Sequence, residues 1–214
     1  MRLSFLAAFL AFGVHMAVFA ADAPVAQLVG DAAAGQTKSA ACVACHGVDG
    51  NSADPSFAKI AGQHAGYLVR HLHLFKSGER ENAIMAAQAS LLSDQDMSDV
   101  AAYFATQKVR AGITDETLLA HGQALYRGGT TAGVPSCMGC HGPSGRGNPA
   151  AKYPAIAGQH SAYAKAQLER FRGGMIYGKD EYANKQIMSQ VAKNLSDADI
   201  DALASYLEGL HAAE

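Results

Sequence analysis

An internal repeat is the feature that most constrains how these 214 residues can fold. Two stretches, offset by roughly a hundred residues, match along most of their length. Each contains a Cys-x-x-Cys-His-Gly segment, at 42–47 and 137–142. Each segment is followed about twenty residues later by the sequence Ile-Ala-Gly-Gln-His, at 60–64 and 156–160. The chain is therefore expected to form two similar domains.

The repeat continues towards the end of each domain. Both copies contain an Ile-Met pair, with a serine eight residues after the methionine and a tyrosine eighteen residues after it. These residues are Met85, Ser93 and Tyr103 in the first copy and Met188, Ser196 and Tyr206 in the second. The copies differ in length mainly before the methionine, as is usual for surface loops. The repeat predicts domains at 21–110 and 111–214, with a linker near 110–114.

The hydrophobic pattern predicts an all-α fold, because no stretch has convincing strand alternation. Ser93 and Ser196 each precede acidic residues and apolar residues at helical spacing, which is typical of a helix start. Further helices are expected over 30–40, 65–75, 117–126 and 161–171. Glycine and proline residues gather between these segments, where turns are needed.

The first 20 residues are typical of a secretory signal. A mostly apolar stretch at 3–19 ends in Val18 and Ala20, which fit the small-residue rule for cleavage before Ala21. A retained membrane anchor is the alternative, but about 17 residues is at the short limit for a spanning helix. We therefore expect cleavage of the signal and a periplasmic location.

Charge and hydropathy exclude some partners. The chain has 17 Lys and Arg against 19 Asp and Glu, a formal net charge of -2, so no basic excess points to nucleic acid. No segment after the signal approaches spanning length. The mature chain is therefore expected to be soluble, although it could associate peripherally with a membrane.

The Cys-x-x-Cys pairs could be zinc ligands, redox-active dithiols or haem attachment sites, and the histidine that follows each pair favours haem. Two thiols on one helical turn can form thioethers with the two vinyl groups of a haem, and the next imidazole then faces the iron. A disulfide framework would need cysteines outside the motifs, and there are none. We expect two covalently bound haem c groups, attached through Cys42, Cys45, Cys137 and Cys140, with His46 and His141 as iron ligands.

Each iron needs a sixth ligand or an open position, and Met85 and Met188 are the predicted ligands. Each lies well downstream of its own motif, so the chain can wrap the haem edge and reach the opposite face. A methionine in a helical protein is more often core filler, an interpretation that suits Met97. Met175 is a rival to Met188. A pair of histidines, His64 and His160, is the less favoured alternative and would displace the methionines. Both are expected instead at a helix start near the haem edge, or in solvent.

Groups around the ligands can also be predicted. A ligating imidazole usually donates its other N–H to a backbone carbonyl. Pro154 could supply that carbonyl in the second domain and Ala58 in the first. Arg80 is expected either to neutralise a haem propionate or to be a solvated loop cation. The histidines of the predicted mature chain without a repeat equivalent are expected at the surface, and these are His71, His73, His121 and His211.

The chain resembles the cytochrome c4 family, dihaem members of the class I cytochromes c, over nearly the whole predicted mature chain. The resemblance is carried by the paired Cys-x-x-Cys-His motifs, the two Ala-Gly-Gln-His sequences and the paired methionines. It implies two tandem class I cytochrome c domains related by a pseudo-two-fold axis, with haem propionates facing each other across the interface. It also implies that Gly35 and Gly122 let the first and last helix of each domain cross closely, with an aromatic residue alongside.

The resemblance implies an electron carrier and no enzymatic activity. The expected partners are membrane respiratory complexes, with a quinol-oxidising donor and a terminal oxidase as acceptor. A cytochrome subunit of a sulfide-oxidising flavocytochrome is the alternative. A dihaem peroxidase would need an iron with an open or displaceable position, which the paired methionines argue against.

Overall fold

The computed structural model describes residues 28–179 and 184–211. The predicted signal peptide, residues 1–20, lies outside the described residues. Within the described part, the regular structure is helical, and the only β pairing is an isolated bridge between Asn148 and Tyr153. The all-α prediction is confirmed. None of the helices in the described ranges is long and apolar enough to cross a membrane.

Each domain contains five α-helices in the described residues. Those of the first domain are α1 (Ala32–Lys38), α2 (Val43–His46), α3 (Ala65–Ser77), α4 (Ala83–Ser90) and α5 (Asp94–Ala105), with a 3-10 turn at Ser39–Cys42. Those of the second domain are α6 (Glu116–Gly128), α7 (Met138–His141), α8 (Ser161–Arg172), α9 (Ile187–Ala192) and α10 (Asp197–Gly209).

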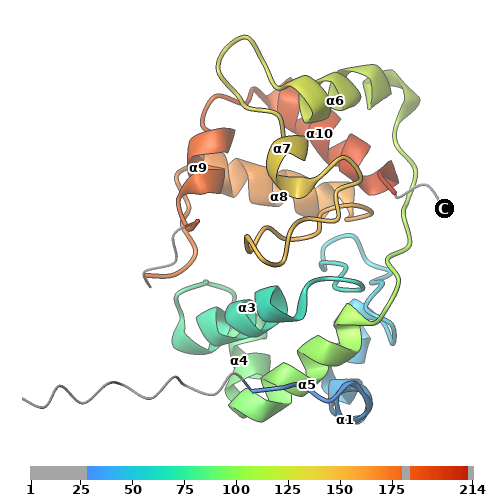
Figure 1. The fold of residues 1–214 in the computed structure, drawn as a ribbon, viewed down its shortest axis with the longest axis vertical. Helices are drawn as coiled ribbons and strands as arrows, with labels where there is room; N and C mark the ends of the chain where they lie inside the picture. The colour runs from blue at the N-terminus through green and yellow to red at the C-terminus, as the bar shows by residue number, and fades with distance from the viewer. Residues whose placement is uncertain (1–27, 180–183, 212–214) are drawn as a thin grey trace, which may run out of the picture.

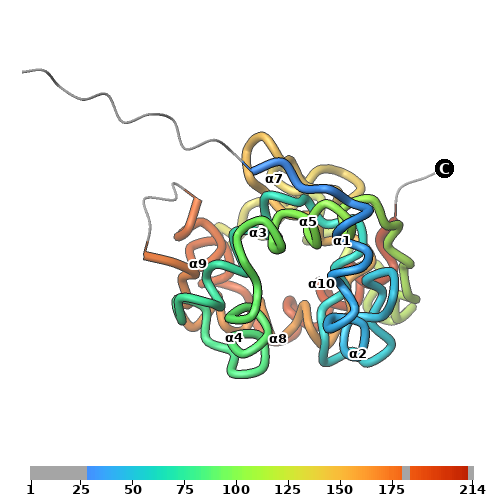
Figure 2. The backbone as a smooth tube through the Cα atoms, turned by 90° about the horizontal axis from the view of Figure 1, so that it is seen from below, coloured from blue at the N-terminus to red at the C-terminus, as the bar shows by residue number. Residues whose placement is uncertain are grey.

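The two groups of helices form separate bodies that face each other. Figure 1 shows α6 to α10 above α1 to α5, with an extended segment between α5 and α6 running along one side. Seen from below in Figure 2, α1, α3, α4 and α5 are arranged around a common centre rather than in a flat layer. The helices of the first domain therefore surround its centre from several directions.

The predicted helix starts at Ser93 and Ser196 are confirmed as capping boxes. The Ser93 side chain accepts from the backbone N–H of Asp96, and the Asp96 carboxylate accepts from the backbone N–H of Ser93. Ser196 and Asp199 repeat both bonds in the second domain. Each box satisfies backbone donors that a helix N-terminus otherwise leaves unpaired, so the last helix of each domain begins at a fixed residue.

The first and last helices of each domain cross at a glycine. A Cβ on Gly35 would lie 2.0 Å from the backbone oxygen of Asp99 in α5 and 2.9 Å from the Cβ of Tyr103. A Cβ on Gly122 would lie 2.3 Å from the backbone oxygen of Ala202 in α10 and 2.7 Å from the Cβ of Tyr206. The expected close crossing beside an aromatic residue is confirmed in both domains.

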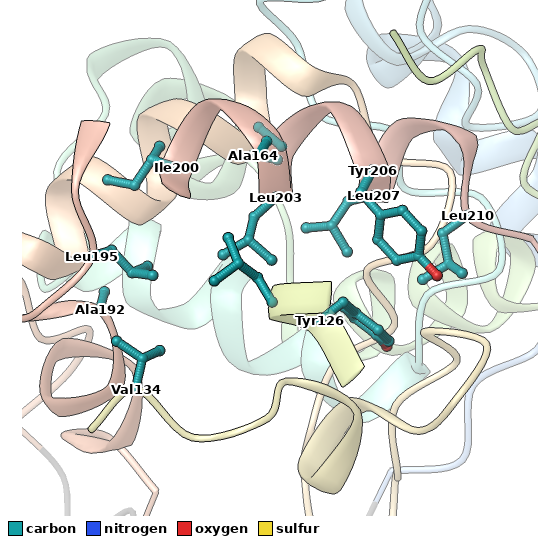
Figure 3. Packing of buried hydrophobic residues seen from close by; sticks show 13 residues of the cluster. Tyr126, Val134, Ala164, Ala192, Leu195, Ile200, Leu203, Tyr206, Leu207 and Leu210 are labelled. Carbon is teal, nitrogen blue, oxygen red and sulfur yellow. The ribbon is translucent and has the colours of Figure 1, made fainter. Parts of the chain in front are cut away.

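The largest buried cluster lies in the second domain, between α6, α8 and α10. Tyr126 and Ile200 are fully buried there, and Leu203 is nearly so. Figure 3 shows Ile200, Leu203 and Leu207 along α10, with Tyr126 of α6 below Leu207. A smaller cluster in the first domain contains Met97, which is also fully buried and therefore fills the core as predicted.

Candidate haem sites

Both Cys-x-x-Cys-His segments adopt the same short helical turn. α2 and α7 each contain the second cysteine and the histidine, and Gly47 and Gly142 end them with φ of 77°. A positive φ is readily adopted by glycine, so the chain can turn away immediately after the histidine. The four cysteines form no disulfide and are partly buried. No group of three or more His, Cys, Asp or Glu residues in the described ranges could hold a metal ion, which does not support a zinc site.

A backbone carbonyl fixes the imidazole in each motif. The Nδ1 of His46 lies 2.8 Å from the carbonyl oxygen of Ala58, and the Nδ1 of His141 lies 2.9 Å from that of Pro154. A carbonyl can only accept, so Nδ1 carries the proton and Nε2 of the neutral ring keeps a lone pair. Burial lowers the pKa of both imidazoles, which also favours the neutral form. The expected roles of the Ala58 and Pro154 carbonyls are confirmed.

Met85 and Met188 occupy equivalent positions near the starts of two short helices, α4 and α9. The backbone N–H of Met85 donates to the side-chain oxygen of Asn82, 2.9 Å away, which caps α4. Met85 is partly buried against Phe75 and its neighbours. Met188 is also partly buried, whereas its rival Met175 is exposed and precedes α9.

Comparison with known proteins places this arrangement in a family. The Cytochrome c family model matches residues 32–108 and again 119–211. A relative described as "Cytochrome c4" from Pseudomonas aeruginosa is 48% identical over 87% of this chain and 92% of its own length. Another "Cytochrome c4", from Azotobacter vinelandii, is 45% identical over the same shares. The crystal structure of reduced recombinant cytochrome c4 from Pseudomonas stutzeri has a TM-score of 0.80 and 46% identity, covering 86% of this chain and all of that one.

The chain belongs to the cytochrome c4 family. Like other members of this family it is an electron carrier and not an enzyme. Cytochrome c domains bind haem c covalently through Cys-x-x-Cys-His motifs, and this member has two such domains and therefore two haems with iron. The described residues fit that group, because both motifs have unpaired thiols on one turn and a neutral imidazole with its outer N–H already bonded.

The two cytochrome c domains contact each other through reciprocal hydrogen bonds. The side chain of Gln63 bonds the backbone N–H and C=O of Ala155, at 3.0 and 2.8 Å. The side chain of Gln159 bonds the backbone N–H and C=O of Lys59, at 2.8 and 2.9 Å. Equivalent residues thus make equivalent contacts in both directions, as a pseudo-two-fold axis requires.

The repeated histidines lie at helix starts, one of the two placements expected for them. His64 immediately precedes α3 and His160 precedes α8. His160 is buried, and its Nε2 lies 2.9 Å from the carbonyl oxygen of Ser52 in the other domain. His160 therefore belongs to the domain interface, and the expectation that it could lie in solvent is wrong.

The prediction of a surface position was wrong for His71. Its ring is buried, 4.2 Å from that of Tyr67 and 5.6 Å from that of Tyr177 (centroid to centroid). The Nη1 of Arg80 donates to Nδ1 of His71 across 2.9 Å, and burial with this cation keeps the pKa of His71 well below its usual value. The other three unrepeated histidines are exposed as predicted, and His121 pairs with Asp199.

Arg80 is buried, so one of its two expected roles, that of a solvated loop cation, is wrong. Its guanidinium carbon lies 4.6 Å from the ring centre of Phe75 and 4.5 Å from that of Tyr177. Its Nη2 donates to the hydroxyl of Tyr163 in the second domain, 2.8 Å away. The interface thus contains an aromatic and cationic cluster of Phe75, His71, Arg80, Tyr163 and Tyr177, which sequence reasoning missed because its members come from both domains.

Proposed function

We propose that this chain carries electrons in the periplasm, from a quinol-oxidising membrane complex towards a terminal oxidase. The observation that supports this most is the duplicated site, in which two carbonyl-bonded imidazoles lie in two docked domains. When bound, each haem supplies a one-electron Fe(III)/Fe(II) couple. Two such couples in one chain permit storage of two electrons or passage from one partner to another.

The proposed attachment residues are the four cysteines, Cys42 and Cys45 in the first domain and Cys137 and Cys140 in the second. His46 and His141 are proposed as iron ligands on one side. Their Nδ1–H bonds hold each ring in one orientation and leave Nε2 as the ligating atom.

Met85 and Met188 are the proposed ligands on the other side. A thioether favours ferrous iron and so raises the reduction potential. With both axial positions taken, no position remains where a substrate could bind, which agrees with the family's role as electron carriers. The exposure of Met175 supports Met188 over its rival.

The processing of the chain and its domain boundaries are also proposed. Residues 1–20 are proposed as a cleaved secretory signal, with the domains at 21–110 and 111–214. The contacts of the linker support the second boundary, because the N–H of Gly112 donates to the carbonyl of Glu208 in α10 across 2.8 Å.

The high identity to proteins described as "Cytochrome c4" favours the role of a separate electron carrier over that of a flavocytochrome subunit. Peripheral membrane association would bring the carrier close to its partners.

The methionine assignment is tested by replacing Met85 or Met188 with alanine in the full haem-loaded protein, with Met175→Ala as the matched control. Each of the first two variants should lose half of the far-red absorption band assigned to methionine-bound ferric iron. Their reduced forms should also take up one equivalent of carbon monoxide per chain, because one axial position has been opened. Met175→Ala should do neither. An unchanged spectrum for Met188→Ala, with loss of the band in Met175→Ala, would move the second ligand to Met175.

A further inference from the structure

We propose that each glutamine of the repeated Ala-Gly-Gln-His sequence is a positioning residue for the haem ligand of the opposite domain. Gln63 would act on His141, and Gln159 on His46. This inference rests on the proposed function, in which the two histidines bind iron. It assigns to the domain interface a part in setting the reduction potentials.

The connection runs through one peptide group in the second domain. The carbonyl of Pro154 and the N–H of Ala155 belong to the same amide. Nδ1–H of His141 donates to that carbonyl across 2.9 Å, and the amide N–H donates to Oε1 of Gln63 across 3.0 Å. The bond is trans, so its C=O and N–H point in opposite directions. The imidazole and the glutamine of the other domain therefore bond opposite sides of a single polarisable group.

The first domain repeats this chain of bonds. Nδ1–H of His46 donates to the carbonyl of Ala58 across 2.8 Å, and the N–H of Lys59 in the same peptide group donates to Oε1 of Gln159 across 2.8 Å. The following peptide is held as well, since Nε2 of Gln159 donates to the carbonyl of Lys59. The arrangement is present twice, in opposite directions, which a chance surface contact would not give.

The surroundings fix which way each glutamine amide points. Oε1 of Gln63 also accepts from the backbone N–H of His64 at 3.0 Å, and Nε2 donates to the carbonyl of Ala155 at 2.8 Å. Gln159 makes the same bond to the N–H of His160. A flipped amide would set donors against donors, so the acceptor oxygen is held on the peptide N–H. Gln63 is also buried, which limits exchange of these bonds for water.

Hydrogen bonds in a chain polarise one another. An acceptor on the Ala155 N–H makes the Pro154 carbonyl a better acceptor, and a stronger bond to Nδ1–H makes His141 a more basic ligand. A more basic ligand stabilises ferric iron and lowers the reduction potential. Removing the amide of Gln63 should therefore raise the potential of the second-domain haem, although Gln63 belongs to the first domain.

A purely structural role predicts a different result. If the glutamines only hold the domains together, their loss admits water to the shared interface and affects both haems. The test uses Gln63→Met and Gln159→Met, which keep the length of the side chain but remove its hydrogen-bonding groups. Gln36→Met, at an exposed position in α1, is the control.

The measurement is a redox titration of the full two-haem protein, with each step assigned from the domain whose backbone amide NMR signals change with it. Gln63→Met should raise the second-domain potential and leave the first-domain potential within error. Gln159→Met should do the reverse, and Gln36→Met should change neither. A shift in the variant's own domain, equal shifts in both domains, or no shift would each overturn the proposal.

A second substitution at the same position keeps the proposal testable if the methionine variants fold poorly. Gln63→Glu loses the donor to the Ala155 carbonyl but keeps an acceptor for the Ala155 N–H, and a carboxylate accepts more strongly than an amide. It should lower the second-domain potential by more than the first-domain potential, and the opposite order would contradict the proposal. Failure of the proposed function can be distinguished from failure of this inference, because the redox titration of the unmodified protein would then lack two separate one-electron steps.

Discussion

The helix crossing at Gly122 gives the most direct test of how the second domain is packed. In Gly122→Ala, the new Cβ would lie 2.3 Å from the backbone oxygen of Ala202 and 2.7 Å from the Cβ of Tyr206. An ordinary contact begins near 3.4 Å, so α6 and α10 must separate by about 1 Å. Neither obstacle can rotate away, because one is backbone and the other is the first atom of a side chain.

The cost follows from this separation. Forcing one carbon into a packed helix crossing costs about 1–3 kcal/mol, and sometimes more. Alanine regains up to about 1 kcal/mol over glycine in a helix interior. The overlap is with the backbone of α10, which supplies more of the buried cluster of the second domain than any other helix. We therefore expect the free energy of unfolding to fall by about 2 kcal/mol. For a domain of this size that corresponds to a fall in Tm of roughly 10 °C.

The assay is thermal and urea unfolding of the full haem-loaded protein, followed by circular dichroism of the helices. Gly66→Ala in α3 is the matched control, because a Cβ there meets nothing within 4 Å. The control should be as stable as the original chain or slightly more so. Equal stability of Gly122→Ala and Gly66→Ala would refute the close crossing.

Three further predictions concern single groups. Ser93→Ala removes the side-chain half of the first capping box and should lower the free energy of unfolding by about 1 kcal/mol, measured by urea denaturation. Tyr126→Phe leaves the carbonyl of Gly142 with only the 3.2 Å bond from the N–H of Gly145 and should cost about 0.5–1.5 kcal/mol in the same assay; an unchanged stability would show that water replaces the hydroxyl. Hydrogen bonds from the backbone N–H of Asp31 and, second, from Lys38 lower the pKa of Asp99 to about 2, below its ordinary 3.8. The ionised Asp99 carboxylate therefore stabilises the folded domain above pH 4, and this contribution is lost as the pH falls towards 2. Asp99→Asn should therefore flatten the stability profile of the first domain between pH 4 and 2, and an unchanged slope would assign that acid sensitivity to other groups.

The sequence predicted what depends on local pattern and on the repeat. Ser93 and Ser196 were identified as helix starts because capping residues act within one turn. The carbonyls of Ala58 and Pro154 were found because any haem-ligating imidazole needs an acceptor for its outer N–H, and the repeat aligned the two positions.

The features that the sequence did not predict are two short helices and the contacts between the two domains. α4 and α9 have 8 and 6 residues, too few for a clear helical period. His71 was predicted at the surface, and a solvated position was one of two alternatives for Arg80, because part of their burial is provided by the other domain, through Tyr163 and Tyr177. A polar side chain on a helix face gives no local sign that a second domain will cover it.

Each domain is proposed to bind one iron between an imidazole and a thioether. The most direct measurement is near-infrared magnetic circular dichroism of the fully oxidised full chain, with the signal scaled to the number of haems found in the same sample. The account predicts two haems per chain, both with the charge-transfer band of histidine–methionine coordination. A bis-histidine or high-spin signal from either haem would contradict it.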